Sequence, residues 1–338
     1  MTDTTREIRL ASRPEGEPRL ENFALAEAPL PEPGDGEVLV RNSYLSVDPY
    51  MRGRMRDVRS YIPPFGVGEV LQGGAVGQVL TSNDAALEAG DWVESMLGWR
   101  EHYVAKPDGL RQVDPSRAPV STALGVLGMP GLTAYTGLHE IAKAKEGETV
   151  FVSAAAGAVG GVAGQLARIA GCRVVGSAGS QEKVDHLTEE LGFHAAFDYH
   201  DADLAQALRE HCPDRIDVYF DNVGGEHLDA ALGRMATFGR VALCGMVSAY
   251  NLEEPPPGPR NIAAVIVNRI TVRGFIVMDH YDLMERFATE VTGHIHSGEL
   301  RYRETIVEGI ERMPAAFIGL LAGENIGKML VKVGPAAE

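Results

Sequence analysis

The pattern of apolar residues between positions 148 and 183 predicts a strand, a tight turn, a helix and a second strand. The short β-branched and aromatic run Thr149–Val152 is typical of a buried strand. From 160 to 170 apolar residues recur at helical spacing, and Gly171 follows where a helix C-cap would stand. A second strand is expected over 173–176. The stretch therefore has the pattern of a β-α-β unit.

The turn after the first strand carries small residues at the spacing of a dinucleotide-binding loop. Ala155, Gly157 and Gly160 occupy the three positions of a G-x-G-x-x-G pattern, with alanine in the first. Small residues let the backbone approach a pyrophosphate, and the helix N-terminus offers N–H groups and partial positive charge to that anion. The alternative is a close helix–strand turn without a ligand, but the flanking strand and helix favour the dinucleotide site.

The residues beyond the second strand favour NADP over NAD. An NAD site places Asp or Glu about 20 residues past the glycines, on the ribose hydroxyls, whereas 175–180 contains no acid. Lys183 follows, and a lysine there can pair with a 2′-phosphate. An ordinary solvated helix lysine is the alternative, which the missing acid makes less satisfactory.

The rest of the chain divides into a β-rich part and an alternating part. Short strand-like runs separated by glycine and proline turns, at 37–40, 67–71, 75–80 and 91–96, predict a barrel-like β domain. After Lys183 strands and helices alternate, which predicts a doubly wound parallel sheet. The expected elements are a helix over 184–192, strands at 195–199 and 216–221, a helix at 204–210, and strands at 238–247 and 268–278.

Ligands of such sheets lie at the carboxyl ends of the strands, where Tyr199, Asn222 and Tyr250 are expected. Tyr199 has the alternative of a half-buried tyrosine, and Asn222 that of a left-handed turn residue. Near the other end of the chain, 308–321 is expected to be a helix, and 323–333 a turn and a last strand that returns to the first domain. We therefore expect one domain from 1–125 with 301–338, and a second over 126–300.

The net charge, the lengths of the apolar runs and the cysteine content limit which classes of partner this protein can bind. A net charge of −16 over 338 residues argues against a general affinity for nucleic acid or anionic membranes. No apolar run of about 18 residues occurs, and the N-terminus lacks a signal-peptide core, so a cytoplasmic protein is expected. The three cysteines, Cys172, Cys212 and Cys244, include no closely spaced metal-binding pair.

Seven strings together make the chain resemble the zinc-independent medium-chain dehydrogenase/reductases, in the branch of the prostaglandin reductases and bacterial curcumin reductase. They are LSVDPYMRGRM (45–55), GVLGMPGLTAY (125–135), AAAGAVG (154–160), GCRVVGSAGSQEK (171–183), FDNVGG (220–225), CGMVSAYN (244–251) and GENIGKMLVKV (323–333). The zinc-binding alcohol dehydrogenases share the fold but use a cysteine and histidines on a catalytic metal. This chain has no cysteine before Cys172, so its first domain lacks that thiolate and no metal is expected.

The resemblance implies a GroES-like β domain plus a Rossmann domain, and NADPH-dependent reduction of the carbon–carbon double bond of α,β-unsaturated ketones and aldehydes. It also implies a homodimer. Carried over by motif, the residues that contact NADP are Gly157, Ala158, Val159, Gly160, Ser177, Lys183, Tyr199, Asn222, Cys244, Gly245, Phe275, Val277 and Asn325.

Tyr50 and Tyr250 match the tyrosines on the substrate side. Hydride transfer to the β-carbon builds negative charge on the carbonyl oxygen, which a neutral hydrogen-bond donor would stabilise. Tyr250 is the first candidate donor, with the cofactor's ribose hydroxyl as a competitor, and Tyr50 is the second. Two other functions stay open: a quinone oxidoreductase of the same superfamily, and a nucleotide-binding protein without catalysis.

Overall fold

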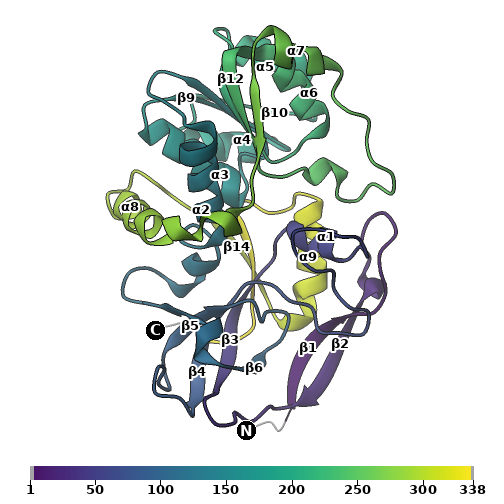
Figure 1. Cartoon of the computed structure of the whole chain (residues 1–338), viewed down its shortest axis with the longest axis vertical. Helices are drawn as coiled ribbons and strands as arrows, with labels where there is room; N and C mark the ends of the chain where they lie inside the picture. The colour runs from purple at the N-terminus through teal and green to yellow at the C-terminus, as the bar shows by residue number, and fades with distance from the viewer. Residues whose placement is uncertain (1–3, 336–338) are drawn as a thin grey trace. The chain divides into compact units, whose positions relative to one another are not determined.

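The computed structural model of the chain describes residues 4–335, which form two compact units (Figure 1). One unit is the continuous segment Gly125–Arg303. The other is formed by the described residues on either side of that segment. Within the described residues, no helix is long and apolar enough to cross a membrane.

The unit Gly125–Arg303 contains a six-stranded sheet in which every neighbouring pair of strands is parallel. The strands lie in the order β10 (Ala195–Asp198), β9 (Arg173–Ala178), β8 (Thr149–Val152), β11 (Ile216–Asp221), β12 (Met235–Leu243) and β13 (Thr271–Gly274). After β10 the chain therefore crosses back over β9 and β8 to form β11 on the other side of β8. The helices are α2 (Met129–Thr136), α3 (Ala158–Ile169), α4 (Gln181–Asp185), α5 (Leu204–His211), α6 (Gly225–Arg234), α7 (Ala264–Val267) and α8 (Met284–His296).

Alternate side chains of the strands enter two separate hydrophobic cores. Val150 and Val152 of β8 pack with helices α2, α3 and α8 on one face of the sheet. Phe151, between them, packs with α5 and α6 on the other face. A strand covered on both faces is buried at every position, and the apolar run Val150–Val152 after Thr149 is its sequence signal. The doubly wound sheet expected from the sequence is confirmed.

Three elements of this unit have bounds that differ from those predicted from the sequence. The strand expected over 238–247 is β12 and ends at Leu243, because the next two N–H groups, of Cys244 and Gly245, share one acceptor, Asp221 O, at 2.9 and 3.0 Å. The strand expected over 268–278 is only Thr271–Gly274, and a 3₁₀ segment begins at Val277. The helix expected over 184–192 is α4 followed by a π-helical turn, His186–Glu190.

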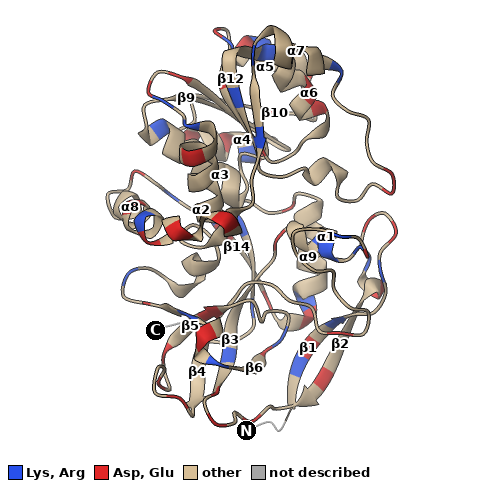
Figure 2. Ribbon diagram, viewed as in Figure 1, with Lys and Arg blue, Asp and Glu red and all other residues tan. Residues whose placement is uncertain are grey.

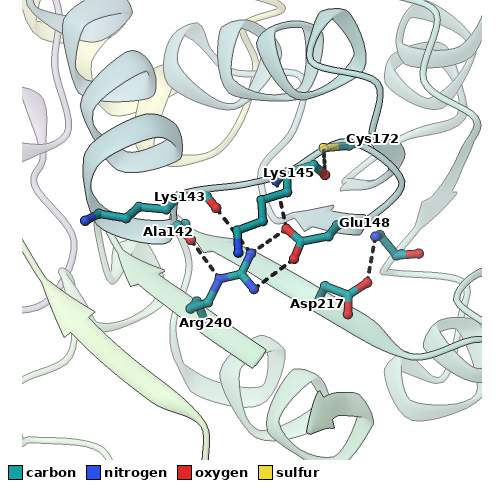
Figure 3. Close-up of polar contacts among 8 residues, drawn as sticks. Ala142, Lys143, Lys145, Glu148, Cys172, Asp217 and Arg240 are labelled. Atoms are coloured by element: carbon teal, nitrogen blue, oxygen red, sulfur yellow. Dashed lines mark hydrogen bonds and ion pairs between the residues drawn. The ribbon is translucent and has the colours of Figure 1, made fainter. Parts of the chain in front are cut away.

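Ion pairing and hydrogen bonds close the amino-terminal edge of the parallel sheet (Figure 3). Arg240 Nη1 donates to Glu148 Oε1 at 2.9 Å, and its Nε donates to Ala142 O at 2.8 Å. On β11, Asp217 Oδ2 accepts from Thr149 N at 2.9 Å. These contacts join Arg240 of β12 to Glu148, which precedes β8, and join the start of β8 to Asp217 of β11.

The other unit holds a mixed seven-stranded sheet and a two-stranded one. The larger sheet runs β14-β15-β3-β4-β5-β7, with β6 paired to β3, and the smaller is β1-β2. The bounds are β1 (Thr4–Leu10), β2 (Phe23–Pro29), β3 (Val38–Ser46), β4 (Ala75–Ser82), β5 (Trp92–Ser95), β6 (His102–Ala105), β7 (Arg111–Val113), β14 (Glu304–Glu308) and β15 (Lys328–Lys332), with helices α1 (Tyr50–Arg54) and α9 (Met313–Leu321).

The last strand returns to this unit as expected, because Leu330 of β15 pairs with Ser46 of β3. The helix expected over 308–321 is divided into a 3₁₀ turn, Ile310–Arg312, and α9. The strand expected over 67–71 is wrong. Only an isolated bridge from Val70 to Arg9 forms there, and Gly68 takes a left-handed φ of 84°, which a strand cannot contain.

Candidate cofactor and active site

The β8–α3 turn has the close packing that a dinucleotide loop requires. Gly157 is the N-cap of α3, with extended backbone, and Ala158, Val159 and Gly160 form the first helical turn. A methyl group added at Gly160 would lie 2.5 Å from Ala154 O and 2.8 Å from Ala155 Cα, both of which are backbone atoms. Only glycine therefore lets this turn lie against the loop. The first N–H groups of a helix have no partner within it, so the turn fits an anionic pyrophosphate.

Ser177, at the end of β9, supports the same loop and offers a further polar group. Its carbonyl oxygen accepts from Ala155 N at 3.0 Å, which holds the two strand ends side by side. Its hydroxyl is buried and has no hydrogen-bond partner among the described residues. A buried polar group without a partner is costly. An unsatisfied hydroxyl beside the turn thus fits a site that a polar ligand completes.

Lys183 and Tyr199 both lie at the β9–α4 turn. Ser180 caps α4, and its carbonyl oxygen accepts from Lys183 N at 3.1 Å. Burial lowers the pKa of Lys183, although Glu182 and Asp198 act to raise it. The hydroxyl of Tyr199 would lie 3.1 Å from a methyl group added at Gly179. The structure therefore brings the tyrosine against the turn that precedes the lysine.

Asn222, at the end of β11, is fixed to the end of β8. Its N–H donates to Ser153 Oγ at 3.0 Å, and its side-chain amide donates to Ser153 O at 2.8 Å. Asn222 is absent from the residues with positive φ in the described chain, so the left-handed turn alternative is wrong. With its amide nitrogen bonded to the protein, Asn222 can offer its carbonyl oxygen to a ligand.

A buried carboxylate, Asp221, organises this strand end. Its Oδ1 accepts from Tyr219 Oη at 2.6 Å and from the N–H groups of Val223 and Gly224 at 2.9 and 2.8 Å. Burial raises the pKa of Asp221, while these donors oppose that effect. Sequence reasoning missed Ser153, Tyr219 and Asp221 as site-building residues. The available signal was an acid at the end of an apolar strand, directly before a glycine pair.

Cys244, Gly245 and Tyr250 lie in the loop that follows β12, and the N–H groups of Cys244 and Gly245 bond to Asp221 O. A methyl group added at Gly245 would lie 3.3 Å from Asn222 O and 3.4 Å from the hydroxyl of Tyr250. The predicted donor Tyr250 is therefore next to Asn222 at the carboxyl edge. Burial raises the pKa of Cys244 to about 12, so its thiol stays neutral and is a weak nucleophile.

Phe275 and Val277 follow β13 at the same edge. Both pack against the core of this unit, and Phe275 reaches Gly137, where an added methyl group would lie 2.9 Å from Phe275 Cζ. A cofactor contact at Phe275 would therefore come from its main chain.

The two remaining predicted residues, Tyr50 and Asn325, belong to the other unit. A buried ion pair links the segments that carry them: Lys328 Nζ donates to Asp48 Oδ1 at 2.9 Å and to Val47 O at 2.7 Å. Tyr50 begins α1 two residues after Asp48, and the amide of Asn325 donates to Gly327 O at 2.7 Å. This ion pair was not predicted from the sequence.

No group of three or more His, Cys, Asp or Glu within residues 4–335 is placed to hold a metal ion.

Comparisons with known proteins agree with this architecture. Residues 6–113 match a model described as the N-terminal domain of oxidoreductase, and residues 158–292 match one described as zinc-binding dehydrogenase. The NADPH-dependent curcumin reductase of Escherichia coli is 46% identical over 96% of this chain and 95% of its own. The 2-alkenal reductase (NADP⁺-dependent) of Nicotiana tabacum is 47% identical over 89% of this chain and 88% of its own.

A crystal structure of CurA from Vibrio vulnificus in complex with NADPH superimposes with a TM-score of 0.93 at 46% identity, covering 98% of this chain and 99% of that one. The family expected from the sequence motifs is thereby confirmed. The chain belongs to the zinc-independent medium-chain dehydrogenase/reductases, in the branch that includes the prostaglandin reductases and curcumin reductase.

Proposed function

We propose that this protein uses NADPH to reduce the carbon–carbon double bond of α,β-unsaturated ketones and aldehydes. The observation that carries the proposal is similarity over nearly the whole chain to enzymes named for such reactions, the curcumin reductase and the 2-alkenal reductase among them. The carboxyl edge of the parallel sheet supplies a glycine turn and polar strand ends that fit this cofactor. When bound, NADPH supplies a hydride for the β-carbon of the substrate.

The protein's own residues would bind and orient the cofactor. The turn of Gly157, Ala158, Val159 and Gly160 receives the pyrophosphate at the start of α3. Lys183 and Tyr199 hold the end that carries the 2′-phosphate. The rest of the cofactor is lined by Ser177, Asn222, Cys244, Gly245, Phe275, Val277 and Asn325.

Tyr250 is the proposed hydrogen-bond donor to the substrate's carbonyl oxygen. A phenol is neutral at neutral pH and carries an O–H, so it can donate as negative charge builds on that oxygen. Its loop is held by Ser248, whose hydroxyl donates to Val223 O at 2.6 Å. Tyr50 is the second candidate, as donor or substrate clamp, and the cofactor's ribose hydroxyl is the competitor of both.

A hydrogen-bond donor replaces metal polarisation in this proposal. The chain has no cysteine before Cys172 that could act as a thiolate ligand in its first domain. Acidic and basic residues are interspersed along the elements of each unit (Figure 2), and the net charge is −16. A small uncharged enone is a better match to such a surface than a polyanion.

The protein is further proposed to act in the cytoplasm as a homodimer. The support for a dimer is β13, an edge strand with all four residues exposed. Nearby apolar side chains are also exposed: Ile266 by 82%, Val267 by 67% and Phe238 by 65%. An unpaired strand edge beside exposed apolar side chains favours aggregation unless it is covered, and the same edge of a second copy would cover it symmetrically. Val272→Lys should shift a dimer to monomer in sedimentation velocity.

The test of the activity is NADPH oxidation followed by stopped flow with a 2-alkenone, a 2-alkenal and a benzoquinone, together with product mass. A saturated ketone or aldehyde, two mass units heavier than the substrate, is expected. Faster turnover of the quinone without enone reduction would support the quinone oxidoreductase alternative instead. Binding of NADPH without turnover of any of them would indicate a protein without catalysis.

A further inference from the structure

His200 lies where Tyr199 meets the β9–α4 turn. A methyl group added at Gly179 would lie 3.1 Å from the hydroxyl of Tyr199 and 3.3 Å from Nε2 of His200. Two polar atoms of consecutive residues thus approach the same face of Gly179. Any side chain at position 179 would crowd both atoms.

The position of His200 is fixed by its neighbours. Its main-chain N–H donates to Asp198 Oδ1 at 2.9 Å, and its ring lies 4.3 Å from that of Tyr199. The ring of His227, on α6, contacts Tyr199 edge-on at 5.0 Å. His200 itself is an exposed residue.

We propose that His200 is a second cationic ligand of the adenosine 2′-phosphate, acting beside Lys183, and that its protonation tunes the preference for NADPH over NADH. This inference rests on NADPH being the cofactor and adds a residue that the sequence motifs did not indicate. An imidazolium donates a charge-assisted hydrogen bond to a phosphate oxygen, whereas a neutral imidazole supplies at most a neutral one. Protonation of the imidazole should therefore strengthen its contact with the phosphate and tighten NADPH binding.

Other ionisable groups lie near His200, and a comparison between pH 6 and 8.5 must allow for them. Burial lowers the pKa of His227 to about 4, so it stays neutral over this range. The remaining neighbours are Tyr199, whose pKa burial raises, Lys183, whose pKa burial lowers, and the carboxylates Asp198 and Asp201. A phosphate monoester itself gains a proton near pH 6, so variants must be compared with the wild type on the same ligand.

The experiment measures binding by calorimetry on the full chain, with adenosine 2′,5′-bisphosphate and 5′-AMP as probes, at pH 6.0 and 8.5. His200→Gln should weaken binding of the bisphosphate by about tenfold at pH 6.0 and by less than about threefold at pH 8.5. Binding of 5′-AMP should be unchanged at both pH values. His296→Gln, which removes an exposed imidazole at the end of α8, is the matched control and should have no effect.

Gly179→Ala provides an independent variant, because its methyl group would enter the space in front of both polar atoms. It should weaken the bisphosphate more than 5′-AMP. An equal loss for the two probes, or the same loss at both pH values with His200→Gln, would overturn the role of His200. If the wild-type protein failed to bind NADPH at all, the proposed function would fall as well, so the two failures are distinguishable.

Discussion

The substitution Gly160→Ala tests whether the first turn of α3 is built for a close approach to the cofactor. The added methyl group would lie 2.5 Å from Ala154 O and 2.8 Å from Ala155 Cα. Because both are backbone atoms, neither can rotate away, and the start of α3 must move relative to the β8 loop. Overpacking of this kind costs about 1–3 kcal/mol, while Gly→Ala within a helix contributes about 1 kcal/mol in the opposite direction. We expect a net loss of stability of about 0–2 kcal/mol.

Gly293→Ala on α8 is the matched control, since nothing lies within 4 Å of its added methyl group. It should gain up to about 1 kcal/mol, a rise in melting temperature of about 2–4 °C. The variants Gly160→Ala and Gly293→Ala should differ more clearly in their affinity for NADPH than in their stability. A displaced helix start should weaken binding by at least about tenfold in Gly160→Ala, because a displacement of about 1 Å at a positioned site carries a penalty of that order or more. A fluorescence titration in which Gly160→Ala binds NADPH like the wild type, with a raised melting temperature, would refute the reasoning.

Four further predictions follow from single side chains. Tyr250→Phe should keep the NADPH dissociation constant and lose most of kcat, by about 10²–10³-fold if the hydroxyl is a preorganised donor; unchanged turnover would remove that role. Lys183→Ala should raise KM for NADPH by about tenfold or more and hardly alter NADH use, whereas an equal effect on both would argue against a phosphate contact. Arg240→Met removes the partner of Glu148 (Figure 3) and should lower the free energy of unfolding by about 1–3 kcal/mol with KM unchanged; a change in KM without loss of stability would contradict this. Burial lowers the pKa of His227 from 6.5 to about 4 in the folded protein, so the unfolded chain takes up this proton first as pH falls below 6.5. The stability that His227 contributes is therefore present above pH 6.5 and lost as pH falls, and urea unfolding should show about 2 kcal/mol less stability at pH 4.5 than at pH 7 from this residue. His227→Gln should remove that part of the difference.

The parallel sheet was predictable because its signals are local. The buried strand Thr149–Val152 is β-branched or aromatic at every position, and α3 shows a helical period followed by a glycine cap. The limits of β12 and β13 were not predictable by the same means. Cys244 and Gly245 are apolar or small enough to continue a strand, and only their hydrogen bonds to Asp221 O, more than twenty residues earlier, end it.

The candidate site was predictable where a short motif carries it and not where distant residues meet. Asn222 and Tyr250 lie in strings that resemble the family, and the structure brings both to the carboxyl edge of the sheet. The contact of Lys328 with Asp48 joins residues 280 positions apart, so no periodicity indicates it. The position of His200 was unpredictable for the same reason, because its proximity to Gly179 depends on the pairing of β10 with β9.

The central claim is that hydride from NADPH reaches the β-carbon of an enone without help from a metal. The most direct measurement uses NADPH deuterated at C4 of the nicotinamide and a 2-alkenone, with enzyme treated with a chelator, and locates the label in the product by NMR. The account predicts a saturated ketone that carries one deuterium on its β-carbon. An allylic alcohol with deuterium on the former carbonyl carbon, or a loss of transfer that zinc restores, would contradict it.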